Sequence, residues 1–251
     1  MKHVLVIGIG AGNPDYVTIQ AINAMNKADV FFVADKGADK SDLNALRREI
    51  CDRFITGKNY RMVEFPSPPR DTSADVYRDG IDATNDRLTE AYEKLLREEL
   101  EDGETAGFLV WGDPSLYDST LRILAHIQSK GELAFNYEVI PGISSIQALA
   151  ARHKVALNRI GEPVEITTGR RLAEGKVNAT GSTVIMLDSR EAFKTVSPDT
   201  DIYWGAYLGT PDEILVSGKV GDVAGKIEKL RAAARQAKGW IMDTYLLKKG
   251  D

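Results

Sequence analysis

The sequence predicts an α/β protein with two α/β domains, an N-terminal domain built on a parallel sheet and a C-terminal domain built on a mixed sheet. In the first half of the chain, short apolar runs rich in β-branched and aromatic residues alternate with amphipathic segments of helical period. In the second half, strand-like runs follow one another through short links, which favour antiparallel pairing. We therefore expect domains 1–140 and 141–251, with the boundary near residue 140.

Each expected strand of the first domain is a short apolar run with Gly, Pro or charged residues near its ends. These strands cover residues 4–8, 30–34, 60–65, 106–111 and 135–140. Helices are expected between them, over residues 18–27, from Ser41 or Asp42 onward, over 74–100 and over 117–129. Thr18 is the expected N-cap of the first helix, because its hydroxyl can accept a hydrogen bond from a backbone N–H of the first turn.

The expected second domain begins with a helix over 145–153, for which Ser144 is the N-cap candidate. Its strands are expected over residues 164–168, 183–188, 202–208, 214–220 and 240–247. A long helix over about 221–237 precedes the final strand. The short connections between several of these strands predict a mixed sheet.

The composition excludes several classes of function. The net charge of -5 argues against a nucleic-acid-binding protein, which normally carries a basic excess. Cys51 is the only cysteine, so an internal disulfide and a cysteine-based metal cluster are excluded. His3, His126 and His153 have no partner at metal-ligand spacing, so we expect no metal. No apolar run approaches the ~20 residues of a membrane span, and we expect a cytoplasmic protein with no membrane partner.

Three glycine-containing turns follow directly after expected strands. They are Gly8–Gly12, Gly112-Asp113-Pro114 and Pro141–Ser145. Loops at the carboxyl ends of parallel strands converge on one crevice, so we expect these turns to lie together. The first turn lacks the third glycine of a dinucleotide fingerprint, because Asn13 followed by Pro14 stands there. The pattern therefore predicts a nucleotide-like ligand other than NAD.

Together the three turns resemble, in order and spacing, the motifs of the tetrapyrrole methylase family. The matching stretches are Val6–Asp15, Gly112–Pro114 and Val139–Ser145, and the resemblance covers nearly the whole chain. It implies two α/β domains with S-adenosylmethionine (SAM) bound in the cleft between them. It also implies a homodimeric methyltransferase that releases S-adenosylhomocysteine (SAH).

The resemblance also implies which residues hold SAM. The family's contacts fall, position by position, on Trp111, Gly112, Asp113, Leu116, Ser144, Ser145, Met186, Leu208 and Gly209. Met186 would then contact the adenine, although from the residues alone it favours core packing. Asp113 would complement the positive sulfonium, although it is equally suited to a turn before Pro114. Ala11 belongs to the same expected site and stands where family members usually carry Pro, which leaves the first loop freer.

Other stretches are similar to the members of this family that methylate C-1 of precorrin-5 and release an acetyl group as acetate. These stretches are 34–40, 47–54 and 202–213. The resemblance makes Asp35 the candidate base for acetyl loss, with Lys36 supplying positive charge, although both also suit an exposed loop. The segment 36–78 has a small excess of Lys and Arg. Arg47 and Arg48 are therefore expected to bind substrate carboxylates, although a solvated helix face explains the same charges.

Several other interpretations stay open at this point. Methylases of the same fold act on another precorrin, on a protein or on RNA, and the acidic balance disfavours RNA. A non-catalytic carrier of a nucleotide or tetrapyrrole would bind its ligand without turnover. A dehydrogenase is disfavoured by Asn13, although Asp29 or Asp35 has the position of a ribose-binding acid.

Overall fold

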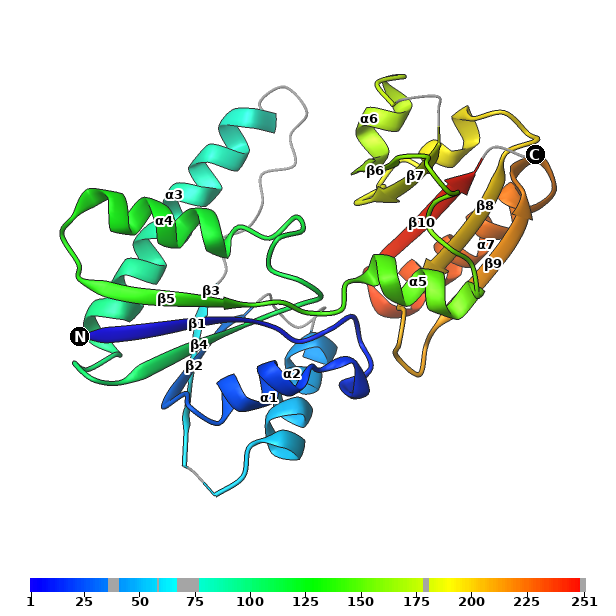
Figure 1. Cartoon of the computed structure of the whole chain (residues 1–251). Helices are drawn as coiled ribbons and strands as arrows, with labels where there is room; N and C mark the ends of the chain where they lie inside the picture. Colours follow the sequence, from blue (N-terminus) through cyan, green and yellow to red (C-terminus); the bar gives the residue numbers. More distant parts are fainter. Residues whose placement is uncertain (36–40, 58, 67–76, 178–180, 249–251) are drawn as a thin grey trace. The chain divides into compact units, whose positions relative to one another are not determined.

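A computed structural model of the chain describes residues 1–35, 41–57, 59–66, 77–177 and 181–248 (Figure 1). It has the expected α/β fold class and divides into two compact units. The first unit consists of Met1–Gly10 and Pro14–Ile143, and the second consists of Ala11–Asn13 and Ser144–Asp251. None of the helices in the described ranges combines the length and the hydropathy needed to span a bilayer.

The first unit is built on a five-stranded sheet in which every neighbouring pair is parallel, as the alternation of strands and helices predicts. Its strands are β1 (Lys2–Gly8), β2 (Val30–Asp35), β3 (Arg61–Pro66), β4 (Thr105–Val110) and β5 (Phe135–Ile140). Their order across the sheet is β3-β2-β4-β1-β5. Because β1 lies between β4 and β5, the turns that follow these three strands leave the sheet side by side.

Helices cover both faces of this sheet (Figure 1). They are α1 (Ile19–Met25), α2 (Ser41–Phe54), α3 (Tyr77–Glu98) and α4 (Thr120–Lys130), with a short 3-10 turn, η1, over Pro14–Tyr16. Alternate residues of β1 enter the two cores, Val4 with α3 and α4, and Leu5 with α1 and α2. Thr18 is the N-cap of α1, as predicted, and its hydroxyl accepts a hydrogen bond of 3.1 Å from the backbone N of Ala21.

The prediction that a helix begins at residue 117 is wrong by three residues. Tyr117 has a left-handed backbone with φ 52°, which a right-handed helix cannot contain. The Asp118 side chain then accepts a hydrogen bond of 2.8 Å from the backbone N of Thr120. This local bond holds the chain in a turn, so α4 begins only at Thr120.

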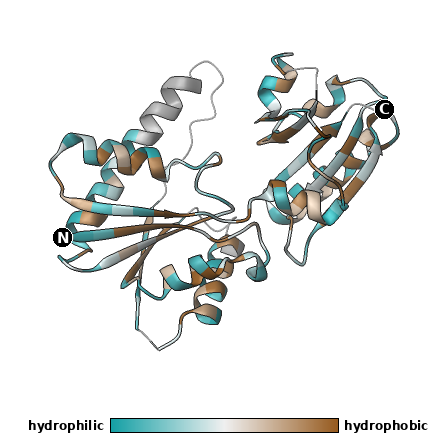
Figure 2. Ribbon diagram, viewed as in Figure 1, coloured by the Kyte–Doolittle hydropathy of each residue, from teal (hydrophilic) through white to brown (hydrophobic). Residues whose placement is uncertain are grey.

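The second unit is built on a mixed five-stranded sheet, as predicted. Its strands are β6 (Val164–Thr168), β7 (Ser182–Met186), β8 (Asp201–Ala206), β9 (Ile214–Lys219) and β10 (Asp243–Lys248). Their order is β6-β7-β10-β8-β9, in which only the β6–β7 pair is parallel. Figure 2 shows hydrophobic residues along the strands of both sheets, as expected for strands covered by helices.

The remaining elements of the second unit are α5 (Ser145–His153), α6 (Gly169–Ala173), a 3-10 turn η4 (Ala192–Thr195) and α7 (Val220–Lys238). The sequence predicts α5 and α7 to within about a residue, whereas it misses the short α6 and η4. Ser144 caps α5 as expected and accepts a hydrogen bond of 3.1 Å from the backbone N of Ile146. Gln147 completes a capping box, which fixes the first turn of the helix.

Residues Ala11–Asn13 of the glycine-rich loop belong to the second unit, although the expected boundary near residue 140 assigns them to the first domain. Gly12 has φ 103°, and a Cβ at this position would lie 2.9 Å from Cγ2 of Thr210 and closer still to the carbonyl oxygen of Leu208. The backbone of the loop therefore touches the turn that follows β8. Only glycine has both the backbone freedom and the small volume for this approach.

Candidate functional site

The three glycine turns of the first unit meet at the carboxyl ends of β1, β4 and β5, where the sequence predicts them to converge. Gly10 and Gly112 form an antiparallel bridge, in which Gly112 N donates to Gly10 O at 2.9 Å. A Cβ at Gly8 would lie 2.6 Å from Gly142 N and 2.9 Å from Gly112 O. The three turns are therefore in backbone-to-backbone contact, and we call this set of three glycines, Gly8, Gly112 and Gly142, the glycine junction.

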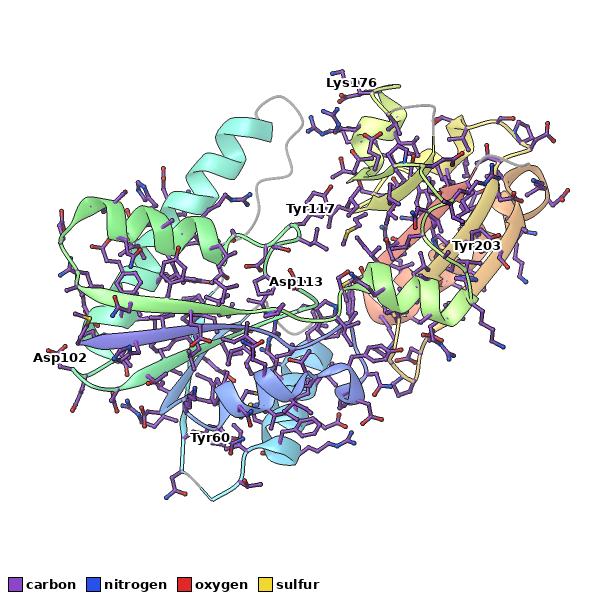
Figure 3. The ribbon with its side chains drawn as sticks, viewed as in Figure 1. Tyr60, Asp102, Asp113, Tyr117, Lys176 and Tyr203 are labelled. Atoms are coloured by element: carbon purple, nitrogen blue, oxygen red, sulfur yellow. The ribbon has the colours of Figure 1, made fainter. Side chains whose placement is uncertain are left out.

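Asp113 joins two of these turns through its carboxylate. Its Oδ2 accepts from Gly142 N at 2.9 Å, and its Oδ1 accepts from Ser115 N at 2.8 Å. Partial burial alone would raise the pKa of Asp113, but the hydrogen bonds from the Ser115 hydroxyl and from the two backbone groups outweigh it and lower the pKa. Asp113 is therefore a carboxylate at neutral pH and places a negative charge on the loop after β4 (Figure 3).

Trp111 and Leu116 lie on the same loop as Asp113, and both are half-buried. Trp111 follows directly after β4, and the backbone N of Leu116 donates to Asp113 O at 3.2 Å. The structure thus brings four of the predicted SAM residues of the first unit onto one hydrogen-bonded loop.

The turn after β8 is the corresponding feature of the second unit and carries Leu208 and Gly209. Gly209 N donates at 2.9 Å to Oε2 of Glu213, and Arg152 Nε of α5 donates at 2.6 Å to the other carboxylate oxygen. Only 11% of the Glu213 side chain is exposed. One carboxylate therefore ties the turn after β8 to the helix whose first residues are the predicted Ser144 and Ser145.

Sequence reasoning missed Glu213 as a residue of this site. The available signal was a carboxylate four residues after Gly209 within Gly209-Thr210-Pro211-Asp212-Glu213, a spacing that suits a side chain folding back on a turn. Arg152, its ion-pair partner, lies 61 positions away, and no local pattern predicts that contact.

Met186 is the last residue of β7 and is half-buried. The loop that follows it is held by hydrogen bonds to buried residues of the second unit. Asp188 is buried, and its Oδ2 accepts from Tyr245 Oη and from Ala192 N, both at 2.7 Å. Arg231 Nη2 donates at 2.6 Å to the carbonyl oxygen of Asp188. These buried contacts hold the chain immediately after Met186, and the sequence gives no sign of them.

The candidate base Asp35 is the last residue of β2, at the same carboxyl edge of the sheet as the glycine junction, and it is exposed. Lys36 lies outside the described residues. In the described parts of the chain, no group of three or more His, Cys, Asp or Glu side chains is arranged to hold a metal ion.

Arg47 does not belong to the solvent-facing basic rim that the sequence suggests. Only 9% of the residue is exposed, because its Nε donates at 3.1 Å to the carbonyl oxygen of Leu109 near the end of β4. Burial lowers the pKa of Arg47, while Tyr92 and Asp118 nearby act to raise it. Arg48 is exposed and pairs with Glu64 of β3. Of the two arginines, only Arg48 is exposed to solvent.

Comparison with known families agrees with the glycine motifs. The sequence model of the tetrapyrrole (corrin/porphyrin) methylases matches residues 3–224 of this chain. This chain belongs to the tetrapyrrole methylase family. The resemblance of the three turns to the motifs of that family is thereby confirmed.

Individual relatives show which members of the family this chain resembles. A precorrin-6A synthase [deacetylating] from Sinorhizobium sp is 53% identical over 251 residues, which cover 100% of this chain and 96% of the relative. The solved structure of a cobalamin synthesis related protein (CobF) from Corynebacterium diphtheriae is 38% identical, with a TM-score of 0.83 and full coverage of both chains. A uroporphyrin-III-C-methyltransferase from Thermus thermophilus shares the fold at a TM-score of 0.60 and 20% identity, covering 98% of this chain and 92% of that one.

Proposed function

We propose that this protein transfers a methyl group from SAM to C-1 of precorrin-5 and releases an acetyl group as acetate, yielding precorrin-6A and SAH. The observation that carries this proposal is the 53% identity over the whole chain to a precorrin-6A synthase [deacetylating]. The second support is the close packing of turns within each unit. In the first unit the turns of the glycine junction meet, and in the second the loop at Gly12 meets the turn after β8, each so closely that only glycine fits.

The residues of the predicted cofactor site fit SAM chemically. When bound, SAM supplies a methyl group on a positively charged sulfur. The lowered pKa of Asp113 keeps a negative charge beside the glycine junction, which suits a cation. Met186 offers a half-buried apolar thioether to an adenine. We propose that the first unit contributes Trp111, Gly112, Asp113 and Leu116, and that the second contributes Ala11, Ser144, Ser145, Met186, Leu208 and Gly209.

The hydrogen bond from Gly209 to Glu213 leads to a testable prediction about cofactor affinity. Glu213→Ala removes the carboxylate that fixes Gly209 N, and bonds to charged groups are worth about 1.5–3 kcal/mol. We expect the Kd for SAH to rise about tenfold, which corresponds to ~1.4 kcal/mol. Glu213→Gln keeps an acceptor for Gly209 N, so its Kd should stay near that of the wild type. Isothermal titration calorimetry with SAH measures both.

A matched control for this prediction is Glu174→Ala, which removes another carboxylate of the second unit. Glu174 pairs only with Arg170 and Lys176 among the ion pairs of the described residues, and neither is a predicted site residue. Its Kd for SAH should not change. Wild-type affinity in Glu213→Ala would show that the bond to Gly209 does not support cofactor binding.

Release of acetate requires groups that methyl transfer does not. A base must take a proton from water as that water adds to the acetyl carbonyl, and a positive group must stabilise the oxyanion that forms. We propose Asp35 as the base, since it ends β2 at the carboxyl edge of the sheet and is exposed. Lys36, the next residue, is proposed to supply the positive charge.

Asp35→Asn tests this assignment, because an amide has nearly the same shape as a carboxylate but cannot accept the proton. We expect acetate release from precorrin-5 to fall by about 10²-fold or more, the usual contribution of a general base. The Kd for SAH should stay unchanged. Asp35→Glu serves as the conservative variant and should restore part of the rate. Wild-type acetate release by Asp35→Asn would remove Asp35 from the mechanism.

We further propose that the protein is a cytoplasmic homodimer with no nucleic-acid or membrane partner. The support for the dimer is family membership, and the support for the location is the biosynthetic role of the relative. Light scattering coupled to size-exclusion chromatography measures the mass in solution. A monomer at micromolar concentration would contradict the proposed homodimer.

The choice of acceptor can be tested directly. The purified protein is incubated anaerobically with SAM and either precorrin-5 or precorrin-4, and SAH formation is measured. We expect SAH to form in the incubation with precorrin-5 and not in the incubation with precorrin-4. SAH formation with precorrin-4 alone would leave a methylase of the same family and contradict the proposed acceptor.

A further inference from the structure

Tyr117 combines two uncommon features, one of its backbone and one of its side chain. Its backbone is left-handed, with φ 52°, and 43% of this large aromatic residue is exposed. Among the described residues, only Leu187 shares this combination of a left-handed backbone and a large exposed apolar side chain, with φ 53° and 59% exposure. Leu187 follows Met186 in the second unit, and Tyr117 follows Leu116 in the first. Each of the two thus stands directly after a proposed SAM contact.

A turn that needed only this backbone shape would favour Gly, Asn or Asp at residue 117, because these residues adopt a left-handed conformation at low cost. An aromatic side chain there costs backbone strain and exposes an apolar ring to water. Strained backbone and exposed aromatic residues both concentrate at functional sites. The strained backbone and the exposed ring together therefore point to a functional role for Tyr117.

The loop around Tyr117 is held in place on both sides. Before it, the Asp113 carboxylate accepts from Ser115 N at 2.8 Å and from Gly142 N at 2.9 Å. After it, the Asp118 carboxylate accepts from Thr120 N at 2.8 Å. The ring is therefore presented from a fixed backbone, which reduces the entropy lost when a ligand covers it. Figure 3 shows Tyr117 and Asp113 on this same loop after β4.

We propose that Tyr117 contacts the tetrapyrrole substrate and contributes to its specificity. The argument rests on the proposed function, which assigns Asp113 and Leu116 to SAM. Methyl transfer is an in-line displacement, so the acceptor lies directly beyond the methyl group and against the residues next to the cofactor contacts. A macrocycle presents a large apolar surface, which an exposed aromatic ring covers well. Tyr117 is the exposed aromatic residue at that place on the loop.

Three variants separate the ring from the backbone shape. Tyr117→Phe keeps the ring, Tyr117→Ala removes it and keeps the strain, and Tyr117→Gly removes both. Binding of precorrin-5 is measured anaerobically, in the presence of saturating SAH, from the absorbance change of the macrocycle. We expect the Kd for precorrin-5 to rise at least tenfold in Tyr117→Ala and Tyr117→Gly and to change less than threefold in Tyr117→Phe. The Kd for SAH should stay within twofold of the wild type in all three.

Lys154→Gly is the matched control. Lys154 also has a left-handed backbone, with φ 56°, but it is the C-cap of α5 and carries no proposed ligand contact. This variant relieves the same strain and should leave both Kd values unchanged. Tyr117→Gly should be at least as stable to heat as Tyr117→Ala, so a loss of substrate binding in the glycine variant cannot be assigned to unfolding.

Either of two results with the variants would overturn the inference about Tyr117. One is a wild-type Kd for precorrin-5 in the folded glycine variant. The other is a loss of SAH affinity equal to the loss of precorrin-5 affinity, which would assign the ring to the cofactor. If the wild-type protein binds SAH but not precorrin-5, the proposed acceptor itself is wrong, and the inference falls with it.

Discussion

Gly142→Ala is expected to abolish measurable SAH binding and to destabilise the first unit by about 3 kcal/mol, the upper part of the range for overpacking in a rigid site. A Cβ at Gly142 would lie 2.8 Å from the carbonyl carbon of Gly8 and closer still to the carbonyl oxygen of Gly112. Both neighbours are backbone atoms at the ends of central strands, so they cannot move aside as a flexible side chain would. The methyl group of an alanine at this position would therefore force the turns of the glycine junction apart.

Gly225→Ala is the matched control for this prediction. Gly225 lies within α7, and a Cβ there would have no atom within 4 Å. Because alanine favours a helix over glycine, we expect this variant to be about 0.5–1 kcal/mol more stable than the wild type. Urea unfolding and SAH titration of both variants test the pair. Wild-type SAH affinity in Gly142→Ala would contradict a functional role for the glycine junction.

Arg231→Met is expected to destabilise the second unit by about 3–5 kcal/mol at pH 7, because it leaves a buried carboxylate without its cation. Arg231 is 3% exposed, and its Nη1 lies 2.9 Å from Oδ2 of Asp243. Its Nη2 also donates to the carbonyl oxygen of Asp188, which lies in the loop that follows Met186. The variant therefore also tests whether this buried pair supports the loop, through the Kd for SAH at a temperature where the variant is folded.

The effect of Arg231→Met should depend on pH. Burial raises the pKa of Asp243 to about 6, although Arg231 and the Trp204 indole N–H act to lower it. The unfolded value is about 3.9, so folding takes up a proton near pH 5, and the stability from Asp243 falls as the pH rises through 6. Without Arg231 the pKa rises further. The variant should therefore lose more stability at pH 7 than at pH 5.

Urea unfolding at the two pH values measures this difference. Arg231→Met combined with Asp243→Asn serves as the control, because the amide keeps an oxygen for Trp204 Nε1 but carries no charge. The double variant should be less destabilised than the single one at pH 7. Because it lacks the Asp243 carboxyl that stabilises the wild type at low pH, its loss relative to the wild type should be smaller at pH 7 than at pH 5, the opposite trend to that of the single variant. An equal loss at pH 5 and pH 7 in the single variant would contradict the account of Asp243.

The sequence predicts the fold well where a periodic pattern extends over a whole element. The alternation of apolar runs and amphipathic segments identifies the parallel sheet, and Thr18 and Ser144 mark helix starts because capping is a local interaction. It fails at Tyr117, where two aspartate side chains shape a turn inside a segment of helical composition. It also fails at Ala11–Asn13, since only the packing of Gly12 assigns them to the second unit.

The candidate site divides in the same way. Convergence of the glycine turns follows from strand topology, and it can be predicted once a parallel sheet is recognised. Contacts between distant segments leave no local pattern, so the ion pair of Glu213 with Arg152 and the hydrogen bond from Arg231 to Asp188 emerge only from the structure. For Arg47 the sequence predicts exposure where the structure shows burial. Arginine is exposed in most proteins, and the burial of Arg47 against Leu109 depends on the packing of α2.

In the proposed reaction, one protein couples methylation of the macrocycle to loss of its acetyl group. The most direct test is an anaerobic incubation of the protein with precorrin-5 and methyl-labelled SAM, in which label in the macrocycle and free acetate are measured over time. We expect one labelled methyl group and one acetate for each macrocycle converted. Labelled macrocycle without acetate would contradict it.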